Sequence, residues 1–183
     1  VFKLLNEFLQ TDFSEKELCE MALDIGVDVP FCIQGGTMLG LDLGEILAPL
    51  PHQEDCFYVI CNPDRKVSTK EAYAAFDRVD TVRHLDQGGM LRALVTGEEA
   101  KLFRAMGNVL EQAVEVPERV EIKSLLRQYG AKAHLMSGSG PTTYGVFKEK
   151  TAAEACCRAL KHAGFSRTFL CCPKPVGVEI TAG

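Results

Sequence analysis

The sequence predicts an α+β protein built in two parts. From residue 56 onward the segments read as strand, helices, strand, strand, helix, strand, which is the split βαβ pattern with helices on one face of an antiparallel sheet. Residues 1–50 read as two helices, a turn and a pair of strands. The chain has 183 residues, 46% of them hydrophobic and 25% charged, which suits one large globular domain or one and a half small ones.

Charge and hydropathy exclude several classes of partner. The net charge of -5 leaves no basic footprint for a nucleic acid or an anionic membrane surface. No apolar run reaches the roughly 20 residues that span a bilayer. The segment Val1–Leu5 has no basic region ahead of its apolar residues, as a signal peptide would have. We therefore expect a cytoplasmic protein without nucleic-acid or membrane partners.

The eight cysteines read as small buried hydrophobes in a reducing cytoplasm. Residues 156–157 and 171–172 are adjacent pairs, whereas Cys56 and Cys61 bound an apolar run. None of them has the two-residue spacing of a zinc knuckle, and no pair of histidines stands nearby. We therefore expect no metal site on these cysteines.

The first nine residues already carry the apolar stripe of an amphipathic helix. Because this helix starts at full strength without a cap, we expect further sequence upstream of Val1. A second helix is expected to open at Ser14, with Glu17 three residues later completing a capping box, and to end at Gly26.

A short apolar turn, residues 26–31, follows that helix and contains one carboxylate. Gly26 can take the left-handed conformation that stops a helix, and Pro30 favours an extended Val29. Asp28 is then held in place among apolar neighbours, which makes it a candidate general base. The alternative is a turn in which Asp28 only caps a nearby backbone amide.

The next elements close the first part of the chain. Residues 35–41 and 45–50 read as two strands of a hairpin, joined by a turn that contains Asp and Gly. The polar connector 51–55 is the most favourable place to divide the chain. We therefore expect two domains, residues 1–52 and residues 53–183.

The second part alternates buried strands with helices that carry start signals. Ser68 and Glu71 predict one capping box, and Thr151 and Glu154 predict another. The expected elements are a strand at 56–61, a helix after Ser68, a loop at 81–87, two or three helices (one with Ala100, Phe103, Met106 and Leu110 on one face), a helix from Pro117 to residues 129–130, strands at 133–136 and 142–147, a helix ending at Gly164, and strands at 167–172 and 176–180.

A glycine-rich loop, residues 137–140, lies between two of these strands. Glycines let a backbone approach a phosphate, or another loop, without a side chain in the way. The loop matches neither the Walker phosphate loop nor the dinucleotide fingerprint. A plain hairpin turn is the alternative.

The segment 68–73 opens a helix directly after a buried strand. Free amides at a helix start can hold anions. Thr69 and Tyr73 are four residues apart, so one helix face presents a hydroxyl below an aromatic ring and can hold a ring with a polar edge. The alternative is that this face is only core packing and a cap.

The order of these motifs is more specific than any one of them. The chain resembles small-molecule kinases of the GHMP superfamily over essentially its whole length, and most closely the branch that phosphorylates a cytidine-diphosphate alcohol. This resemblance implies the remnant of a ribosomal-S5-like N-terminal domain followed by a ferredoxin-like C-terminal domain. The matching segments are residues 25–31, 35–37, 44–45, 67–69 with Tyr73, and 136–141.

The resemblance also implies a role for each candidate residue. Asp28 falls on the family's catalytic aspartate, which accepts the proton of the substrate hydroxyl. Thr69 and Tyr73 fall on residues that line the alcohol site, where the family has Phe as well as Tyr. Gly138, Ser139 and Gly140 fall on the loop that supports the main phosphate-binding loop.

The chain departs from the family pattern mainly by what it lacks. The loop that binds ATP with Mg²⁺, a lysine that assists the catalytic acid, and an aromatic–histidine pair for cytosine are all expected upstream of Val1. The chain alone is therefore expected to be inactive. Val27 and Cys32 differ from the commonest residues beside the acid.

Three alternatives remain open at this point. One is a different GHMP kinase, for homoserine, mevalonate or galactose, against which the segment 68–73 argues. The second is a non-catalytic binding module of ferredoxin-like fold. The third is an RNA-binding sheet, which the acidic charge balance disfavours. The sequence does not indicate an oligomeric state.

Overall fold

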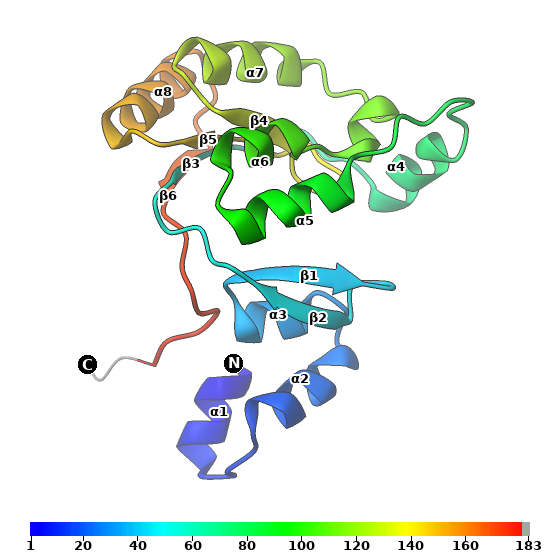
Figure 1. Cartoon of the computed structure of the whole chain (residues 1–183), viewed down its shortest axis with the longest axis vertical. Coiled ribbons are helices and arrows are strands. Elements are labelled where there is room, and N and C mark those ends of the chain that lie inside the picture. Colours follow the sequence, from blue (N-terminus) through cyan, green and yellow to red (C-terminus); the bar gives the residue numbers. More distant parts are fainter. Residues whose placement is uncertain (181–183) are drawn as a thin grey trace. The chain divides into compact units, whose positions relative to one another are not determined.

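The computed structural model describes residues 1–180, with two antiparallel sheets and helices around them (Figure 1). The chain divides into two compact units: unit 1 is Val1–Glu54 with the chain from Pro173 on, and unit 2 is Asp55–Cys172. The elements are α1 (Phe2–Leu9), α2 (Glu15–Leu23), α3 (Val29–Gln34), β1 (Thr37–Leu41), β2 (Ile46–Leu50), β3 (Phe57–Cys61), α4 (Thr69–Phe76), α5 (Gln87–Thr96), α6 (Glu99–Ala105), the 3₁₀ helix η1 (Val109–Gln112), α7 (Glu118–Gln128), β4 (Ala133–Met136), β5 (Thr143–Phe147), α8 (Lys150–His162) and β6 (Thr168–Cys171).

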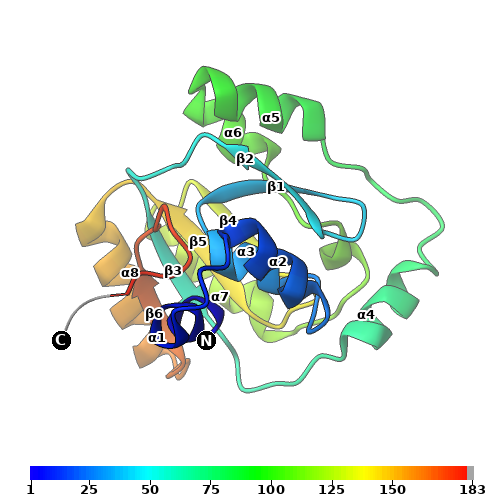
Figure 2. The same cartoon turned by 90° about the horizontal axis from the view of Figure 1, so that it is seen from below.

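Unit 1 combines three short helices with a hairpin. The predicted capping box at the start of α2 is confirmed, because the Ser14 hydroxyl accepts the Glu17 amide and the Glu17 carboxylate accepts the Ser14 amide. The helices α2 and α3 pack together in this unit (Figure 2). The predicted hairpin is also confirmed, with β1 and β2 antiparallel. The small core of this unit contains Leu18, Cys19, Ala22 and Ile33.

The predicted backbone of the turn at 26–31 is wrong. Val29 is helical and begins α3, with Pro30 in its first turn. Proline is compatible with that position, because the amides of a first helical turn have no intrahelical partner in any case. Gly26 does not have a positive φ; instead its carbonyl accepts the Val29 amide at 3.0 Å.

The predicted strand at 176–180 is also wrong, since this segment has no strand geometry. The Gly177 amide donates to the Gln34 carbonyl at 3.0 Å. A Cβ at Gly177 would overlap the Cys32 carbonyl, so the two backbones lie too close together for a side chain between them. A close backbone contact therefore takes the place of a strand ladder.

Unit 2 is organised around the sheet β4-β5-β3-β6, in which every neighbouring pair is antiparallel. Val59 in the central strand β3 lies opposite Gly145 of β5 and Leu170 of β6. The helices α7 and α8 cover one face (Figure 1), as the split pattern predicts. The core on that face contains Val59, Cys61, Ile122, Leu126, Phe147, Ala153, Cys156, Cys157 and Leu160.

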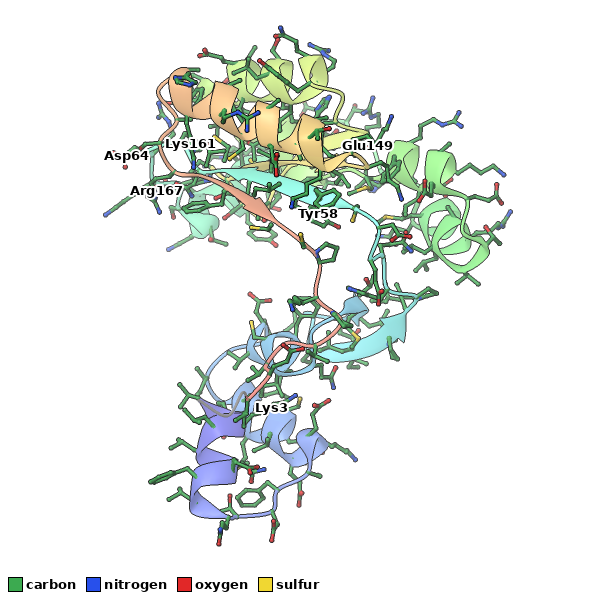
Figure 3. All side chains as sticks on the ribbon, turned by 90° about the vertical axis from the view of Figure 1, so that its left-hand side faces the viewer. Lys3, Tyr58, Asp64, Glu149, Lys161 and Arg167 are labelled. Atoms are coloured by element: carbon green, nitrogen blue, oxygen red, sulfur yellow. The ribbon has the colours of Figure 1, made fainter. Side chains whose placement is uncertain are left out.

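The opposite face of the same sheet carries tyrosines. Tyr58 points away from α8 (Figure 3), and its ring centroid lies 6.1 Å from that of Tyr144. Burial raises the pKa of both phenols above its ordinary value. Phe103 and Met106, from and just after α6, pack beside them. This face is therefore partly covered within unit 2.

Two helix predictions in unit 2 need correction. The helix with Ala100 does not reach Leu110: α6 ends at Ala105 because Met106 is extended, and the following Gly107 lies so close to the Leu85 side chain that a Cβ would overlap it. Leu110 belongs instead to η1. The capping box of Thr151 is absent as well, because α8 begins at Lys150 with Glu149 as its N-cap, so that Thr151 lies inside the helix.

Burial of the cysteines agrees with the prediction for five of them, Cys19, Cys56, Cys61, Cys156 and Cys157. Cys171 is partly buried, and the prediction is wrong for Cys32 and Cys172, which are exposed. Burial raises the pKa of the Cys156 thiol to about 12. Between residues 1 and 180, no helix is long and apolar enough to cross a membrane.

Candidate functional site

A cavity of about 660 Å³ lies in unit 2, between the second half of α4, the segment that leads into α5, the start of η1 and the loop that follows β4. The helix α4 begins where predicted, with the Ser68 hydroxyl accepting the Glu71 amide at 3.3 Å. The lining residues come from five stretches of the sequence, and they are Tyr73, Phe76, His84, Leu85, Gln87, Gly107, Asn108, Val109, Leu110, Met136, Ser137, Gly138 and Tyr144.

The structure brings two of the predicted stretches together. The hydroxyls of Thr69 and Ser139 are 3.1 Å apart, so the start of α4 is hydrogen-bonded to the glycine loop. Tyr73 lies one helical turn after Thr69, lines the cavity and is 56% exposed as a residue. Tyr73 is therefore not a core residue in the described part of the chain, which was the alternative for this face.

The glycine loop closes the β4–β5 hairpin, so the loop is a hairpin turn as well as one wall of the cavity. The Ser137 amide donates to the Thr142 carbonyl at 2.8 Å, and the Gly140 amide donates to the Ser137 carbonyl at 2.9 Å. Gly138 and Gly140 have φ values of 54° and 88°. These are left-handed conformations that side chains disfavour, which explains the two glycines.

Asn108 contacts the loop and was not predicted. Its Nδ2 donates to the carbonyls of Met136 and Gly138, both at 2.8 Å, and its Oδ1 accepts the Leu110 amide at 2.9 Å. An Asn ahead of a short helix is a recognisable cap. Nothing in the local sequence indicates that the same side chain reaches a loop about thirty residues further on.

Charged groups lie beneath the loop. The Glu111 carboxylate accepts the Met136 amide and pairs with Lys123, and both side chains are largely buried. Burial, followed by the charge of Glu111, raises the pKa of Tyr144. Burial, followed by the charge of Lys123, lowers the pKa of His134. The charges of Glu111 and Lys123 therefore balance each other, and Glu111 also holds the end of β4 through the Met136 amide.

Asp28 lies in unit 1, at the position immediately before α3. Its carboxylate is exposed and caps no amide of that helix. The expected apolar surroundings of this carboxylate are therefore wrong for the described residues, and so is the capping alternative. Its catalytic role stays a prediction.

Comparison with known proteins identifies the class. The family described as GHMP kinases C terminal matches residues 90–166, which span the cavity wall at Asn108 and the glycine loop. The chain therefore carries a GHMP kinase C-terminal domain, as the sequence resemblance predicts.

A particular enzyme recurs among its relatives. A 4-diphosphocytidyl-2-C-methyl-D-erythritol kinase of Geobacillus kaustophilus is 40% identical over 146 residues, which are 79% of this chain and 50% of that protein. The crystal structure of a 4-(cytidine 5'-diphospho)-2C-methyl-D-erythritol kinase superposes with a TM-score of 0.74 at 27% identity, over 91% of this chain and 59% of that one.

A homoserine kinase of Cytophaga hutchinsonii superposes with a TM-score of 0.77 over 94% of this chain and 62% of that one. Its sequence identity is only 22%, so this likeness bears on the fold alone. The chain spans about half the length of the curated relatives it matches.

Proposed function

We propose that this chain belongs to a kinase that transfers the γ-phosphoryl group of ATP to the 2-hydroxyl of 4-diphosphocytidyl-2-C-methyl-D-erythritol. The observation that carries the proposal is the hydrogen bond between Thr69 and Ser139, which joins the predicted alcohol segment to the predicted phosphate segment beside one cavity. The relative from Geobacillus kaustophilus, which bears this enzyme's name, supports the same substrate. The sequence resemblance implies a cytoplasmic role in non-mevalonate isoprenoid biosynthesis.

In this proposal each residue of the chain has one task. The Tyr73 ring stacks on the cytosine, and the Thr69 hydroxyl bonds the polar part of the same substrate. The Asp28 carboxylate accepts the proton of the substrate's 2-hydroxyl, whose oxygen attacks the γ-phosphorus while the bond to the bridging oxygen of ADP breaks. ATP, when bound, supplies the transferred phosphoryl group. Most of the rate enhancement then comes from positioning and charge stabilisation.

The glycine loop is chemically suited to phosphate oxygens. The amides of Gly138 and Ser139 donate to none of the described residues, and neither glycine of the loop presents a side chain. The main ATP loop is proposed to lie in sequence that precedes Val1. Within residues 1–180, no three His, Cys, Asp or Glu side chains gather as metal ligands, so we assign no step to Mg²⁺ on these residues.

We also propose the finer description of the fold. The order β4-β5-β3-β6, with the first strand of the unit beside the last, supports a ferredoxin-like C-terminal domain. The helices and hairpin of unit 1 are proposed to be the remnant of a ribosomal-S5-like domain. The domain boundary is proposed at residues 52–53, in the polar connector.

A chimera tests the proposed function. The N-terminal segment of the Geobacillus kaustophilus relative that precedes its match to this chain is joined ahead of Val1, and ADP release is measured with 4-diphosphocytidyl-2-C-methyl-D-erythritol, homoserine and mevalonate. We expect turnover with the cytidine alcohol at least about a hundred-fold above the other two, because a site built for polar groups rejects substrates that lack them. The 183-residue chain alone should give no turnover.

Two results would contradict the proposal. A chimera that melts cooperatively but prefers homoserine or mevalonate would overturn the substrate. A chimera that melts cooperatively and phosphorylates none of the three would overturn the kinase activity itself.

A further inference from the structure

Asn108 holds two peptide groups of the glycine loop with a single side-chain amide. The two N–H groups of Nδ2 donate to the carbonyls of Met136 and Gly138, so both side-chain donors are used. Its Oδ1 simultaneously accepts the Leu110 amide. No shorter neutral side chain offers two donors and one acceptor from one planar group.

Because the peptide group is planar, holding a carbonyl also fixes the direction in which the N–H of the next residue points. In a trans peptide the carbonyl and the following N–H point in opposite directions. The Met136 carbonyl faces Asn108, and the next amide, that of Ser137, accordingly donates on the other side, to Thr142. The Gly138 carbonyl faces Asn108 in the same way, so the Ser139 amide must point away from it.

The Ser139 amide differs from the Ser137 amide in having no acceptor among the described residues. Gly138, which precedes it, has φ 54° and open space where a Cβ would be. An oriented amide without a protein acceptor, on a loop without obstructing side chains, is a donor for an anionic oxygen.

We propose that Asn108 is a positioning residue that orients the Ser139 amide toward a phosphate oxygen of the bound nucleotide. This inference rests on the proposed function for the identity of the anion, but the orientation of the loop does not depend on it. Asn108 touches no reacting atom; it acts through the Gly138–Ser139 peptide.

The remaining contacts of the loop make this role specific to Asn108. Thr69 holds only the Ser139 hydroxyl, which rotates independently of the peptide plane. Glu111 holds only the Met136 amide, at the end of β4. Asn108 is therefore the described side chain that fixes the orientation of the Gly138–Ser139 peptide itself.

The substitution Asn108→Ser separates the orientation of the Gly138–Ser139 peptide from the capping of η1. A serine at this position can still cap η1 by accepting the Leu110 amide, and it adds no charge that would repel phosphate. Its hydroxyl is too short to donate to both loop carbonyls. Gln112→Ser is the matched control, because Gln112 is on the same turn and its amide bonds the backbone of Arg83 instead of the loop.

The first measurement is amide hydrogen exchange in the 183-residue chain, read by nuclear magnetic resonance. Asn108→Ser should speed exchange at Ser137 and Gly140, the two bonded amides of the loop, by about ten-fold or more, because two hydrogen bonds are lost beside them. Gln112→Ser should leave both amides unchanged. Equal acceleration in the two variants, or none in either, would overturn the proposal.

The second measurement is steady-state kinetics in the chimera. Asn108→Ser should raise KM for ATP by about five-fold or more and leave KM for the alcohol within about two-fold, because one charge-assisted hydrogen bond to phosphate is lost. Unchanged KM for ATP in an active chimera would overturn the positioning role. If the parent chimera is inactive, the proposed function fails, and the exchange rates alone decide whether Asn108 orders the loop.

Discussion

The two units of the molecule differ in how completely they bury their own apolar side chains. In unit 2 the helix α8 buries four residues against the sheet, and the core beneath it is closed to solvent. In unit 1 the helix α1 buries none, and Phe8 is 79% exposed. Most of the large exposed apolar side chains of the described residues belong to unit 1.

The difference indicates which part of the chain is stable by itself. A four-stranded sheet with two covering helices buries enough apolar surface to hold its shape, whereas a two-stranded hairpin is marginal without further packing. The binding residues Thr69 and Tyr73 belong to the well-packed unit, and the proposed acid Asp28 belongs to the sparsely packed one. Each of the following predictions tests one side of this contrast.

The largest expected effect is on the rate of phosphoryl transfer, from a substitution in unit 1. Asp28→Asn in the chimera should lower kcat by about 10² to 10⁴, the usual range for the loss of a general base. Asp24→Asn is the control, because Asp24 is a nearby exposed carboxylate at the end of α2. A kcat within about three-fold of the parent, in a chimera with unchanged circular dichroism, would exclude Asp28 as the base.

The second effect compares the same substitution in the two units. Leu126→Ala, in the fully buried core of unit 2, should lower the free energy of unfolding by about 2 to 5 kcal/mol. Leu9→Ala, on the exposed side of α1, should change it by less than about 0.5 kcal/mol.

Urea titration measures this second pair. All four tyrosines of the chain lie within residues 55–172 and there is no tryptophan, so tyrosine fluorescence reports on unit 2 alone. Circular dichroism in the far ultraviolet follows both units. Equal losses for Leu126→Ala and Leu9→Ala would mean that unit 1 is packed as well as unit 2.

The third effect is smaller and concerns the cavity in unit 2. Tyr73→Ala should raise KM for the cytidine alcohol about five-fold, equivalent to about 1 kcal/mol for one stacked aromatic face, while KM for ATP stays within about two-fold. Tyr73→Phe should be nearly silent, because stacking needs the ring and not the hydroxyl. Equal changes for both substrates in Tyr73→Ala would assign the ring to packing instead.

The sequence predicts most of the fold because the strands and several helix starts are encoded locally. The continuous apolar run at 56–61 and the Ser14 signal depend on neighbours a few positions away, and the strand and the capping box that they predict are both confirmed. Two of the failures involve contacts between segments that are distant in the sequence. Gly107 lies against the Leu85 side chain just after α6, and Gly177 lies against the backbone of α3, neither of which a local pattern can indicate.

In the candidate site, too, local motifs could be predicted, whereas contacts between distant segments could not. The glycine loop and Thr69 are visible as local motifs, and the structure joins them. The role of Asn108 was not visible, because its two acceptors lie about thirty residues away on the other side of α7 in the sequence. The exposure of the Asp28 carboxylate also could not be predicted, because it depends on which other segments pack around it.

The smallest expected effect is a pH dependence in unit 2, from His134. Its Nδ1 is buried without a hydrogen-bond partner among the described residues, and burial followed by the charge of Lys123 lowers its pKa from the ordinary value of 6.5. Arg127 lowers the pKa further, and Glu111 partly opposes this. The unfolded chain therefore takes up a proton at this residue at a higher pH than the folded chain does.

Stability linked to His134 should thus be fully present above pH 6.5 and be lost as the pH falls through the lowered pKa. The urea midpoint of the parent, followed by tyrosine fluorescence, should fall between about pH 7.5 and pH 5, a window above the titration of ordinary carboxylates. His134→Gln cannot take up this proton, so its midpoint should fall less. His162→Gln, at the exposed end of α8, should retain the slope of the parent. Parallel slopes for the parent and His134→Gln would mean that the fold of unit 2 accommodates the protonated imidazole without loss of stability.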